Sequence, residues 1–365
     1  MVPILIFIFV AHCFLGHLIE IYKLKPLSIV MSFILLALSL FFTLGLHYTA
    51  DYDMYYFMFK TEYMETDILY QYLTSVFKEN SLTFHDLHAF HILTATLLFY
   101  FIISRFSTNF FYVFLVYIVL DYVHFANQIR YFLGFPLMII ALYSFVKKRY
   151  FFGIVLSIVA SLSHSSLIVL ITFLPLWYFV KKKYFLKVIL ILSGICLLIV
   201  FLLFSLGIGR QIDHFGEYFK QDGVSSFLGG ALNGIPYIIM LTVLYFESRK
   251  YIKNKPECFK NPKFAFLYTI TFYTILFVPA SFFMQIAGHR YVMPFMIFYV
   301  IFYLFLIEDD SRKSKSLKMI FFSCICFILS LVIYILPESI FGVSHFQTEL
   351  DYMLKSIPYI NYSEW

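Results

Sequence analysis

The sequence has 365 residues, of which 62% are hydrophobic and 13% charged, and it carries a net charge of +6. A soluble domain has about a quarter of its residues charged, so this composition excludes a soluble protein and indicates an integral membrane protein. The basic residues lie in short clusters and form no contiguous basic face, which excludes a nucleic-acid-binding protein.

Apolar runs recur along the whole chain at the length, about 20 residues, that a helix needs to cross about 30 Å of hydrocarbon. Because β-barrel alternation is absent, we expect an all-α polytopic protein with about 12 transmembrane helices in a single domain, 1–365. The first run has no basic n-region and no cleavage site, so we expect an uncleaved helix there. In chain order, the predicted spans are 2–22, 27–46, 88–103, 110–126, 129–146, a hairpin over 150–180, 185–206, 230–246, 264–283, 290–307 and 317–336.

The basic clusters predict the orientation of these spans. Placing the clusters in the cytoplasm assigns most of the 27 Lys and Arg residues to one side, as the positive-inside rule requires. Both termini are then external. Three external segments follow from this arrangement: 47–87, 207–229 and the tail 337–365.

The stretch 150–180 is too long for one straight span and too short for two full ones. A single crossing would move every later basic loop to the wrong side, so we expect a hairpin. Two helices of about 15 residues rise only about 22 Å, which leaves the tip SLSHSS, 161–166, below the outer surface. His164 at that depth must line a wet cavity or be buried in protein.

Three arginines are predicted on the external side, each next to an apolar span: Arg130, Arg210 and Arg290. A charge is costly there unless it is paired or faces water. Guanidinium groups suit phosphate oxygens, and three near one cavity would match a pyrophosphate. The alternative is that each arginine reaches lipid headgroups or pairs with a carboxylate: Asp51, Asp121 or Asp213.

Asp51 and Asp53 begin the polar part of ADYDMYYFMFK and are candidates for a general base. On a strand they would share a side, whereas on a helix they would point about 200° apart, so only one is expected to be catalytic. The alternative is an acidic cap on an external helix. His164 is either a base or a histidine satisfied by its neighbouring serines, and His214 and His289 are weaker candidates.

The tyrosines Tyr52 and Tyr55 are either part of an interfacial aromatic belt or platforms for sugar rings. Five cysteines, mostly in apolar runs, argue against a disulfide framework or a zinc site. Motifs for a phosphate loop, a zinc protease or a serine hydrolase are missing. We therefore expect no metal and no cofactor.

The sequence resembles the EpsG/Wzy-type polysaccharide polymerases over most of its length. The motifs that carry the resemblance are DYDMYY from Asp51, NQIRYFLGF around Arg130, SLSHSSLIVL around His164 and GHRYVMPFMIFY around Arg290. The family pattern reads R-Q-x-x-A, whereas here Tyr131 follows the arginine, Gly134 holds the alanine position and Gln128 lies two residues before.

The resemblance implies a GT-C-like, lipid-dependent glycosyltransferase that joins undecaprenyl-pyrophosphate-linked oligosaccharides into an O-antigen, capsule or exopolysaccharide. The site would face the periplasm from the bacterial inner membrane, with lipid-linked donor and acceptor, membrane lipids and a chain-length regulator protein as partners. Arg130, Arg290 and Arg210 would stabilise the departing pyrophosphate. Asp51 or His164 would take the acceptor proton, and the remaining substrate contacts would be Tyr52, Asp53, Tyr55, Gln128, His214 and His289.

Two other functions share several of these features. An O-antigen ligase typically has a larger late external loop than 207–229. A lipid-linked oligosaccharide flippase would place charges or broken helices near the midplane, often in duplicated halves.

Overall fold

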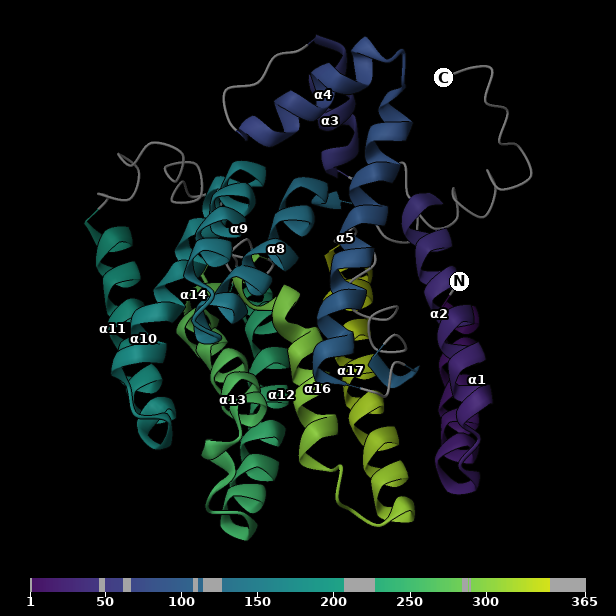
Figure 1. Cartoon of the computed structure of the whole chain (residues 1–365), viewed down its shortest axis with the longest axis vertical. Coiled ribbons are helices and arrows are strands. Elements are labelled where there is room, and N and C mark those ends of the chain that lie inside the picture. Colours follow the sequence, from purple (N-terminus) through teal and green to yellow (C-terminus); the bar gives the residue numbers. More distant parts are fainter. Residues whose placement is uncertain are drawn as a thin grey trace. The chain divides into compact units, whose positions relative to one another are not determined.

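The computed structural model of the protein describes residues 2–45, 50–61, 67–107, 111–113, 127–206, 227–283, 288 and 290–341. Every regular element in these ranges is helical, which confirms the all-α prediction (Figure 1). The chain forms two compact units, 1–171 with 310–365 and 172–309, and each is described by itself. The single transmembrane domain therefore stays a prediction.

Several helices in the described ranges are suited to a membrane by length and composition alone. Four are long and apolar enough to cross it: Phe84–Phe106, Ile129–Val146, Lys182–Leu203 and Gly229–Asn254. Shorter apolar helices cover Phe9–Tyr22, Lys25–Leu38, Tyr150–Ser163, Ser165–Phe179 and Met293–Leu306. These helices agree with a multi-pass protein. The number of twelve spans stays a prediction, and most of 110–126 lies outside the described residues.

The first unit begins with two long helices, α1 (Val2–Tyr22) and α2 (Lys25–Gly45). The last described helix, α17 (Arg312–Phe341), packs against α1. Phe9 of α1 stacks on Phe327 of α17 with ring centroids 4.3 Å apart. The first, second and last predicted spans are thus confirmed as helices.

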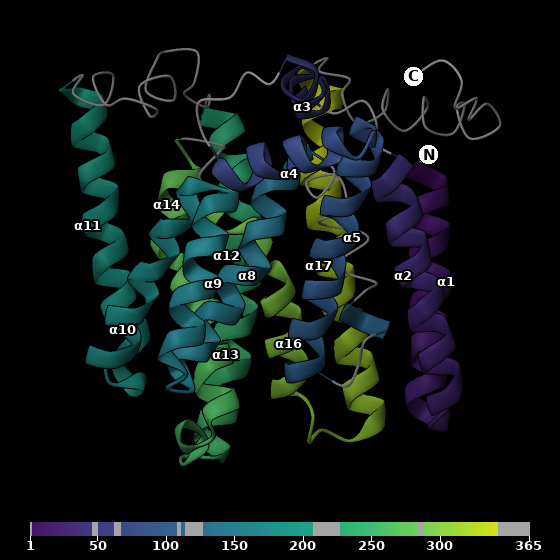
Figure 2. The same cartoon turned by 45° about the horizontal axis from the view of Figure 1, so that its top comes forward.

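The predicted external segment contains two short helices, α3 (Ala50–Thr61) and α4 (Ile68–Glu79), which we call the external layer. Figure 2 shows α4 lying across the ends of α5 (Phe84–Phe106) and α9 (Tyr150–Ser163), both of which it contacts. One small hydrophobic core joins the layer to the long helices beneath it: Tyr52, Tyr55, Tyr70, Phe84, Leu87, Ile92 and Ile129. This core holds the external layer in place over the site described below.

Helix α5 begins earlier than the predicted span 88–103 because Thr83 caps it. The Thr83 hydroxyl accepts a hydrogen bond from the Asp86 N–H, and the Asp86 carboxylate accepts one from the Thr83 N–H at 2.7 Å. Such a capping box satisfies two N–H groups that the helix cannot pair internally. The first turn of α5 is therefore helical although its polar residues lie outside the apolar run that predicted the span.

Helix α8 (Ile129–Val146) has the predicted bounds and packs closely against α9. At Gly134, a Cβ atom would lie 2.9 Å from the Ala160 carbonyl oxygen and 3.0 Å from Ser163 Cβ, and it would collide with Leu167. A residue without a side chain is therefore needed for this approach. It brings the end of α9 beside the start of α8.

The predicted hairpin over 150–180 breaks at His164, whose backbone is extended with φ −156° and ψ 115°. The chain continues as a 3₁₀ helix, η1 (Ser165–Thr172), and then as α10 (Phe173–Phe179). The break within the predicted tip is confirmed. The chain up to Ile171 belongs to the first unit, and α10 belongs to the second.

The second unit contains α11 (Phe185–Ser205), α12 (Phe227–Asn254), α13 (Pro262–Tyr273), α14 (Val278–Ser281) and α16 (Met296–Leu306). Helix α16 packs against both α12 and α13. The predicted spans 185–206 and 230–246 fall on α-helices, whereas 264–283 and 290–307 each contain a 3₁₀ turn, at Thr274–Leu276 and at Met293–Phe295.

The predicted span 264–283 is helical but is not one regular α-helix, because α13 ends at Tyr273 and a 3₁₀ turn follows at Thr274–Leu276. Pro279 lacks the N–H that an α-helix would offer to the Ile275 carbonyl four residues earlier. Ser193 Oγ donates to that carbonyl instead, at 2.9 Å. A buried backbone group in a membrane needs such a partner, and the partner comes from a distant part of the sequence.

Candidate functional site

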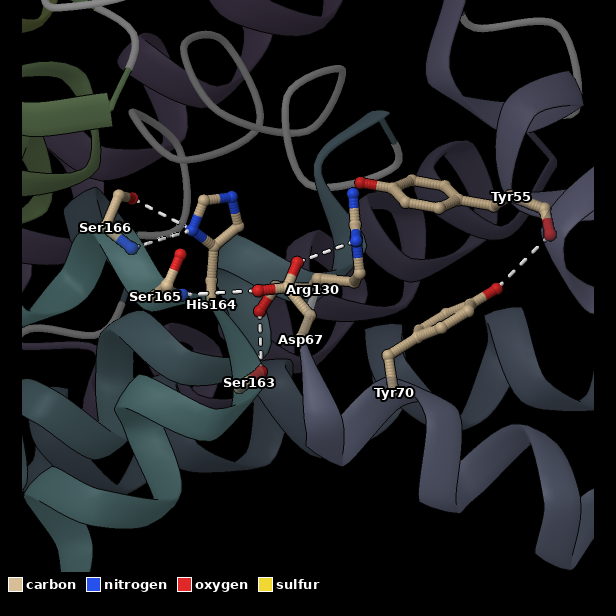
Figure 3. Close-up of polar contacts among 8 residues, drawn as sticks. All are labelled: Tyr55, Asp67, Tyr70, Arg130, Ser163, His164, Ser165 and Ser166. Carbon is tan, nitrogen blue, oxygen red and sulfur yellow. Dashed lines mark hydrogen bonds and ion pairs between the residues drawn. The ribbon is translucent and has the colours of Figure 1, made fainter. Parts of the chain in front are cut away.

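Arg130 lies in the first turn of α8, and the residue is only 9% exposed. Its Nη1 atom lies 2.6 Å from Oδ2 of Asp67 (Figure 3). The guanidinium carbon lies 4.8 Å from the ring centroid of Tyr55 and 5.7 Å from that of Tyr70. The carboxylate of Asp67 and the rings of Tyr55 and Tyr70 therefore lie beside this charge. Their attraction to the guanidinium offsets part of the cost of burying it.

Asp67 immediately precedes α4, and its backbone is left-handed, with φ 57° and ψ 69°. Its second carboxylate oxygen, Oδ1, accepts a hydrogen bond from the Ser165 N–H at 3.2 Å. The carboxylate thus joins the external layer, the start of α8 and the predicted hairpin tip. The carboxylate that pairs with Arg130 here, Asp67, is not one of the three that we considered; pairing with Asp51 stays a prediction, and Asp121 and Asp213 lie outside the described residues.

Sequence reasoning missed Asp67, although it included Arg130. Asp67 stands in the polar stretch TEYMETD, where two glutamates precede it and no periodic pattern distinguishes it. Only the folding of distant segments against each other brings it to the arginine.

The tyrosines Tyr55 and Tyr70 form the aromatic part of the site. The Tyr70 hydroxyl donates to the Tyr55 carbonyl oxygen at 3.4 Å. Burial raises the pKa of Tyr55, an effect that the neighbouring Arg130 charge opposes, and burial raises the pKa of Tyr70 as well. Both phenols therefore stay neutral at physiological pH, and Asp67 supplies the negative charge beside the guanidinium.

The predicted hairpin tip touches the same arginine through its backbone. The Ser163 hydroxyl donates to the Arg130 carbonyl oxygen at 2.7 Å. His164, the next residue, packs its ring edge-on against Tyr131, with centroids 5.4 Å apart. The structure therefore brings His164 and Arg130, two of the predicted catalytic residues, into one neighbourhood (Figure 3).

The hydrogen bonds of His164 decide which ring nitrogen carries the proton. Nδ1 accepts from the Ser166 N–H at 3.3 Å and lies 2.9 Å from the Ser166 hydroxyl. Because a backbone N–H can only donate, Nδ1 is an acceptor, and the neutral ring carries its proton on Nε2. The serine contact expected in the alternative interpretation of His164 is present, and a catalytic role stays a prediction.

Asp51 and Asp53 both lie in the first turn of α3, so the helical alternative applies to them. Asp51 is half-buried and Asp53 is exposed, and the Asp51 N–H donates to Asn127 Oδ1 at 3.0 Å. Carboxylates in a first turn stabilise a helix through its dipole. Of the pair, Asp51 is the one on the buried side of α3.

Tyr52 and Tyr55 are almost fully buried, at 4% and 3% exposure. The Tyr52 hydroxyl lies 2.8 Å from His85 Nδ1, and its ring packs against Phe84 at 5.0 Å. Both tyrosines therefore support the external layer from inside. Their predicted contacts with sugar rings stay a prediction.

Two buried polar atoms at the start of α8 have no hydrogen-bond partner in the part of the chain that the structure describes. They are Oε1 of Gln128, a residue 7% exposed, and Nε of Arg130. Buried polar groups are normally paired, so each exception needs an explanation. An acceptor and a donor left open at one helix end are suited to a ligand that carries hydroxyl or phosphate groups.

The remaining predicted site residues lie elsewhere in the chain. Arg290 is half-buried and belongs to the second unit, so its meeting with Arg130 at one substrate stays a prediction. Arg210, His214 and His289 lie outside the described residues. Across the described ranges, no group of three or more His, Cys, Asp or Glu side chains is placed to hold a metal ion.

These features define a class: a multi-pass helical membrane protein with a buried, carboxylate-held arginine beside a histidine turn. The chain belongs to the EpsG family, whose family model matches residues 30–348. The family match confirms the resemblance seen in the sequence and indicates a polysaccharide polymerase. No curated protein and no solved structure matches the chain.

Proposed function

We propose that this chain is a GT-C-like glycosyltransferase that joins undecaprenyl-pyrophosphate-linked oligosaccharide repeats into an O-antigen, capsule or exopolysaccharide. The reaction takes place on the periplasmic face of the bacterial inner membrane. The observation that carries the proposal is the buried guanidinium of Arg130, held by Asp67 at 2.6 Å while its Nε has no partner among the described residues. Membership of the EpsG family supports the same reaction class.

Arg130 serves the departure of the lipid pyrophosphate in this proposal. As the bond between the sugar and the pyrophosphate breaks, negative charge develops on phosphate oxygens. A guanidinium that is already oriented and mostly desolvated stabilises this charge without a metal ion. Arg290 and Arg210 supply further positive charge to the same group.

The acceptor hydroxyl must lose a proton as the new glycosidic bond forms. Asp51, half-buried at the start of α3, is the base that we favour. In its neutral form, His164 carries the proton on Nε2, so it is suited to donate a hydrogen bond and not to accept this proton. Gln128, with its open Oε1, is placed to accept from a sugar hydroxyl.

The experiment changes each arginine in turn. Lysine at position 130 replaces the guanidinium but keeps the positive charge that pairs with Asp67, and alanine at position 290 removes the side-chain charge. In a strain that lacks the chromosomal gene, we expect Arg130→Lys and Arg290→Ala to reduce polysaccharide about 10- to 100-fold. The reason is that a hydrogen bond to a charged group contributes about 1.5–3 kcal/mol and about 1.4 kcal/mol changes a rate tenfold. The readout is the polysaccharide ladder per amount of protein in the membrane.

Arg249→Lys is the matched control. Arg249 is exposed, and its guanidinium donates a hydrogen bond to the hydroxyl of Tyr245 in its own helix. This variant should give a wild-type ladder. Full-length polymer from both Arg130→Lys and Arg290→Ala would end the proposal.

The deletion strain separates the proposed function from its alternatives. A polymerase defect leaves single repeats attached to lipid A, whereas a ligase or flippase defect leaves the core undecorated. Undecorated core in the deletion strain would therefore contradict the polymerase assignment.

A further inference from the structure

We propose that Asp67 is a positioning residue of this enzyme, which holds the Arg130 guanidinium and the His164 turn in one fixed arrangement. This inference rests on the proposed function, since it assigns to Asp67 the task of orienting two groups of that reaction. None of the sequence motifs described above includes Asp67.

The two carboxylate oxygens of Asp67 have separate partners. Oδ2 lies 2.6 Å from Nη1 of Arg130, and Oδ1 accepts the N–H of Ser165 at 3.2 Å. Ser165 directly follows His164, so the second contact fixes the backbone of the turn that carries the imidazole (Figure 3). One side chain therefore determines the placement of both groups.

The backbone of Asp67 is consistent with such a constraint. Its left-handed conformation, φ 57° and ψ 69°, is unfavourable for a residue with a side chain, although aspartate tolerates it better than most. Residues in this conformation persist where the surrounding contacts determine them, and they cluster at functional sites. At Asp67 those contacts include the ion pair, the hydrogen bond to the turn and the bonds that its carbonyl oxygen accepts from the Tyr70 and Gln71 N–H groups.

Stability alone does not account for the pair. Asp67 is 8% exposed and Arg130 9% exposed, and burying two charges costs about as much as their attraction returns. Apolar residues of similar volume would serve folding as well. What only a carboxylate provides is a fixed direction for the guanidinium, with one edge held and Nε open among the described residues.

Two substitutions separate the contacts of Asp67. In Asp67→Asn, the amide oxygen can still accept from Ser165, but the amide group can no longer neutralise the guanidinium. In Ser165→Pro, the ion pair stays and the donated N–H is lost. Proline suits the first position of a helix, and the extended backbone of His164 before it is the conformation that proline favours.

Each substitution has a matched control. Ser165→Ala keeps the backbone N–H and removes only the hydroxyl. Asp86→Asn weakens the capping box of α5. It therefore tests the loss of a carboxylate that supports the structure of the first unit but does not contact Arg130 in that box. Asp67→Glu keeps the charge and tests rescue by the conservative residue.

The experiment measures the polysaccharide ladder of the deletion strain carrying each variant, per amount of protein in the membrane. We expect Asp67→Asn and Ser165→Pro to lower polymer about tenfold or more. Ser165→Ala and Asp86→Asn should stay within about twofold of the wild type, and Asp67→Glu should recover most of the loss.

The inference is overturned if both Asp67→Asn and Ser165→Pro give wild-type ladders, or if Asp86→Asn lowers polymer as much as they do. If Asp67→Asn does not reach the membrane, the pair Ser165→Pro and Ser165→Ala decides alone. Full ladders from both Arg130→Lys and Arg290→Ala would instead contradict the proposed function. Loss with Arg130→Lys but not with the Asp67 and Ser165 variants would sink only this inference.

Discussion

Arg130 carries a full positive charge at a position where the residue is almost fully buried. Asp67 provides the opposite charge, and the rings of Tyr55 and Tyr70 provide electron-rich faces at 4.8 and 5.7 Å. Removing one partner of such a buried pair typically costs about 3–5 kcal/mol. For this reason Arg130→Lys is a cleaner probe of the chemistry than Arg130→Ala, which would leave the Asp67 carboxylate uncompensated.

The side chain of Ser193 supplies a hydrogen bond that the backbone of the broken helix cannot make. It donates to the Ile275 carbonyl, which Pro279 leaves without an amide donor. We expect Ser193→Ala to lower the free energy of unfolding by about 1 kcal/mol, because the carbonyl loses its partner inside the second unit. Thermal unfolding of the purified protein in detergent measures the change.

The control for that substitution is Ser205→Ala, since the Ser205 hydroxyl is exposed and donates to the Phe201 carbonyl of its own helix. Its effect should be close to zero. Equal melting temperatures for Ser193→Ala and the wild type would show that the broken helix does not depend on this bond.

At the scale of elements, the two short helices of the external layer pack against the long helices and support the site. Helices α3 and α4 bury Tyr52, Tyr55 and Tyr70 in a small core against the start of α5. Because this core is assembled from aromatic rings on short helices, neither helix would be stable alone. The layer holds its tyrosines against Arg130 only when it is packed on the long helices.

The contact between α8 and α9 depends on Gly134. We expect Gly134→Ala to destabilise the protein by about 1–3 kcal/mol, because its Cβ would meet the Ala160 carbonyl oxygen at 2.9 Å and backbone cannot give way cheaply. The shift of α9 would also move Ser163 from the Arg130 carbonyl, so polymer should fall. Thermal unfolding and the polysaccharide ladder measure both effects.

Gly194 in α11 offers a matched control, since a Cβ there would meet nothing within 4 Å. Gly194→Ala should leave stability unchanged or raise it by up to about 1 kcal/mol through helix propensity. If Gly134→Ala behaves like Gly194→Ala, close packing at Gly134 is not what positions the tip.

At the scale of the whole molecule, the orientation of the chain is the prediction on which the proposed reaction depends. Tyr56 in α3 is exposed in the external layer, and Lys148 is exposed in a basic cluster that we expect in the cytoplasm. In intact spheroplasts, a membrane-impermeant maleimide should label Tyr56→Cys, whereas Lys148→Cys should react only after permeabilisation.

The wild-type chain, with its own five cysteines, gives the background for this labelling. Labelling of both positions from the same side would contradict the orientation. Labelling of Tyr56→Cys only after permeabilisation would, in addition, remove Arg130 from the face where lipid-linked repeats are joined.

The sequence predicted the helices well where apolar runs are long and uninterrupted. The bounds of α8 agree with the prediction, and the break at His164 falls within the predicted tip. Prediction failed where a distant partner decides the local structure. At the break at Thr274–Leu276, the hydroxyl of the distant Ser193 pairs the Ile275 carbonyl, and the polar start of α5 has a capping box.

The site shows the same division. Arg130 and His164 could be predicted because a charge and a histidine next to apolar spans are unusual in themselves. Asp67 could not, since a carboxylate in a polar loop has no local feature that marks it, and its role exists only through contacts with Arg130 and Ser165.

By itself, the sequence determined that this protein is a helical membrane protein and that its unusual charges lie beside its spans. Composition and apolar length decide these properties because a helix that crosses the hydrocarbon of a membrane must be long and apolar. Only the tertiary structure decided which carboxylate holds Arg130 and which nitrogen of His164 carries the proton. Those properties depend on distances of about 3 Å between residues far apart in the chain, and only packing sets such distances.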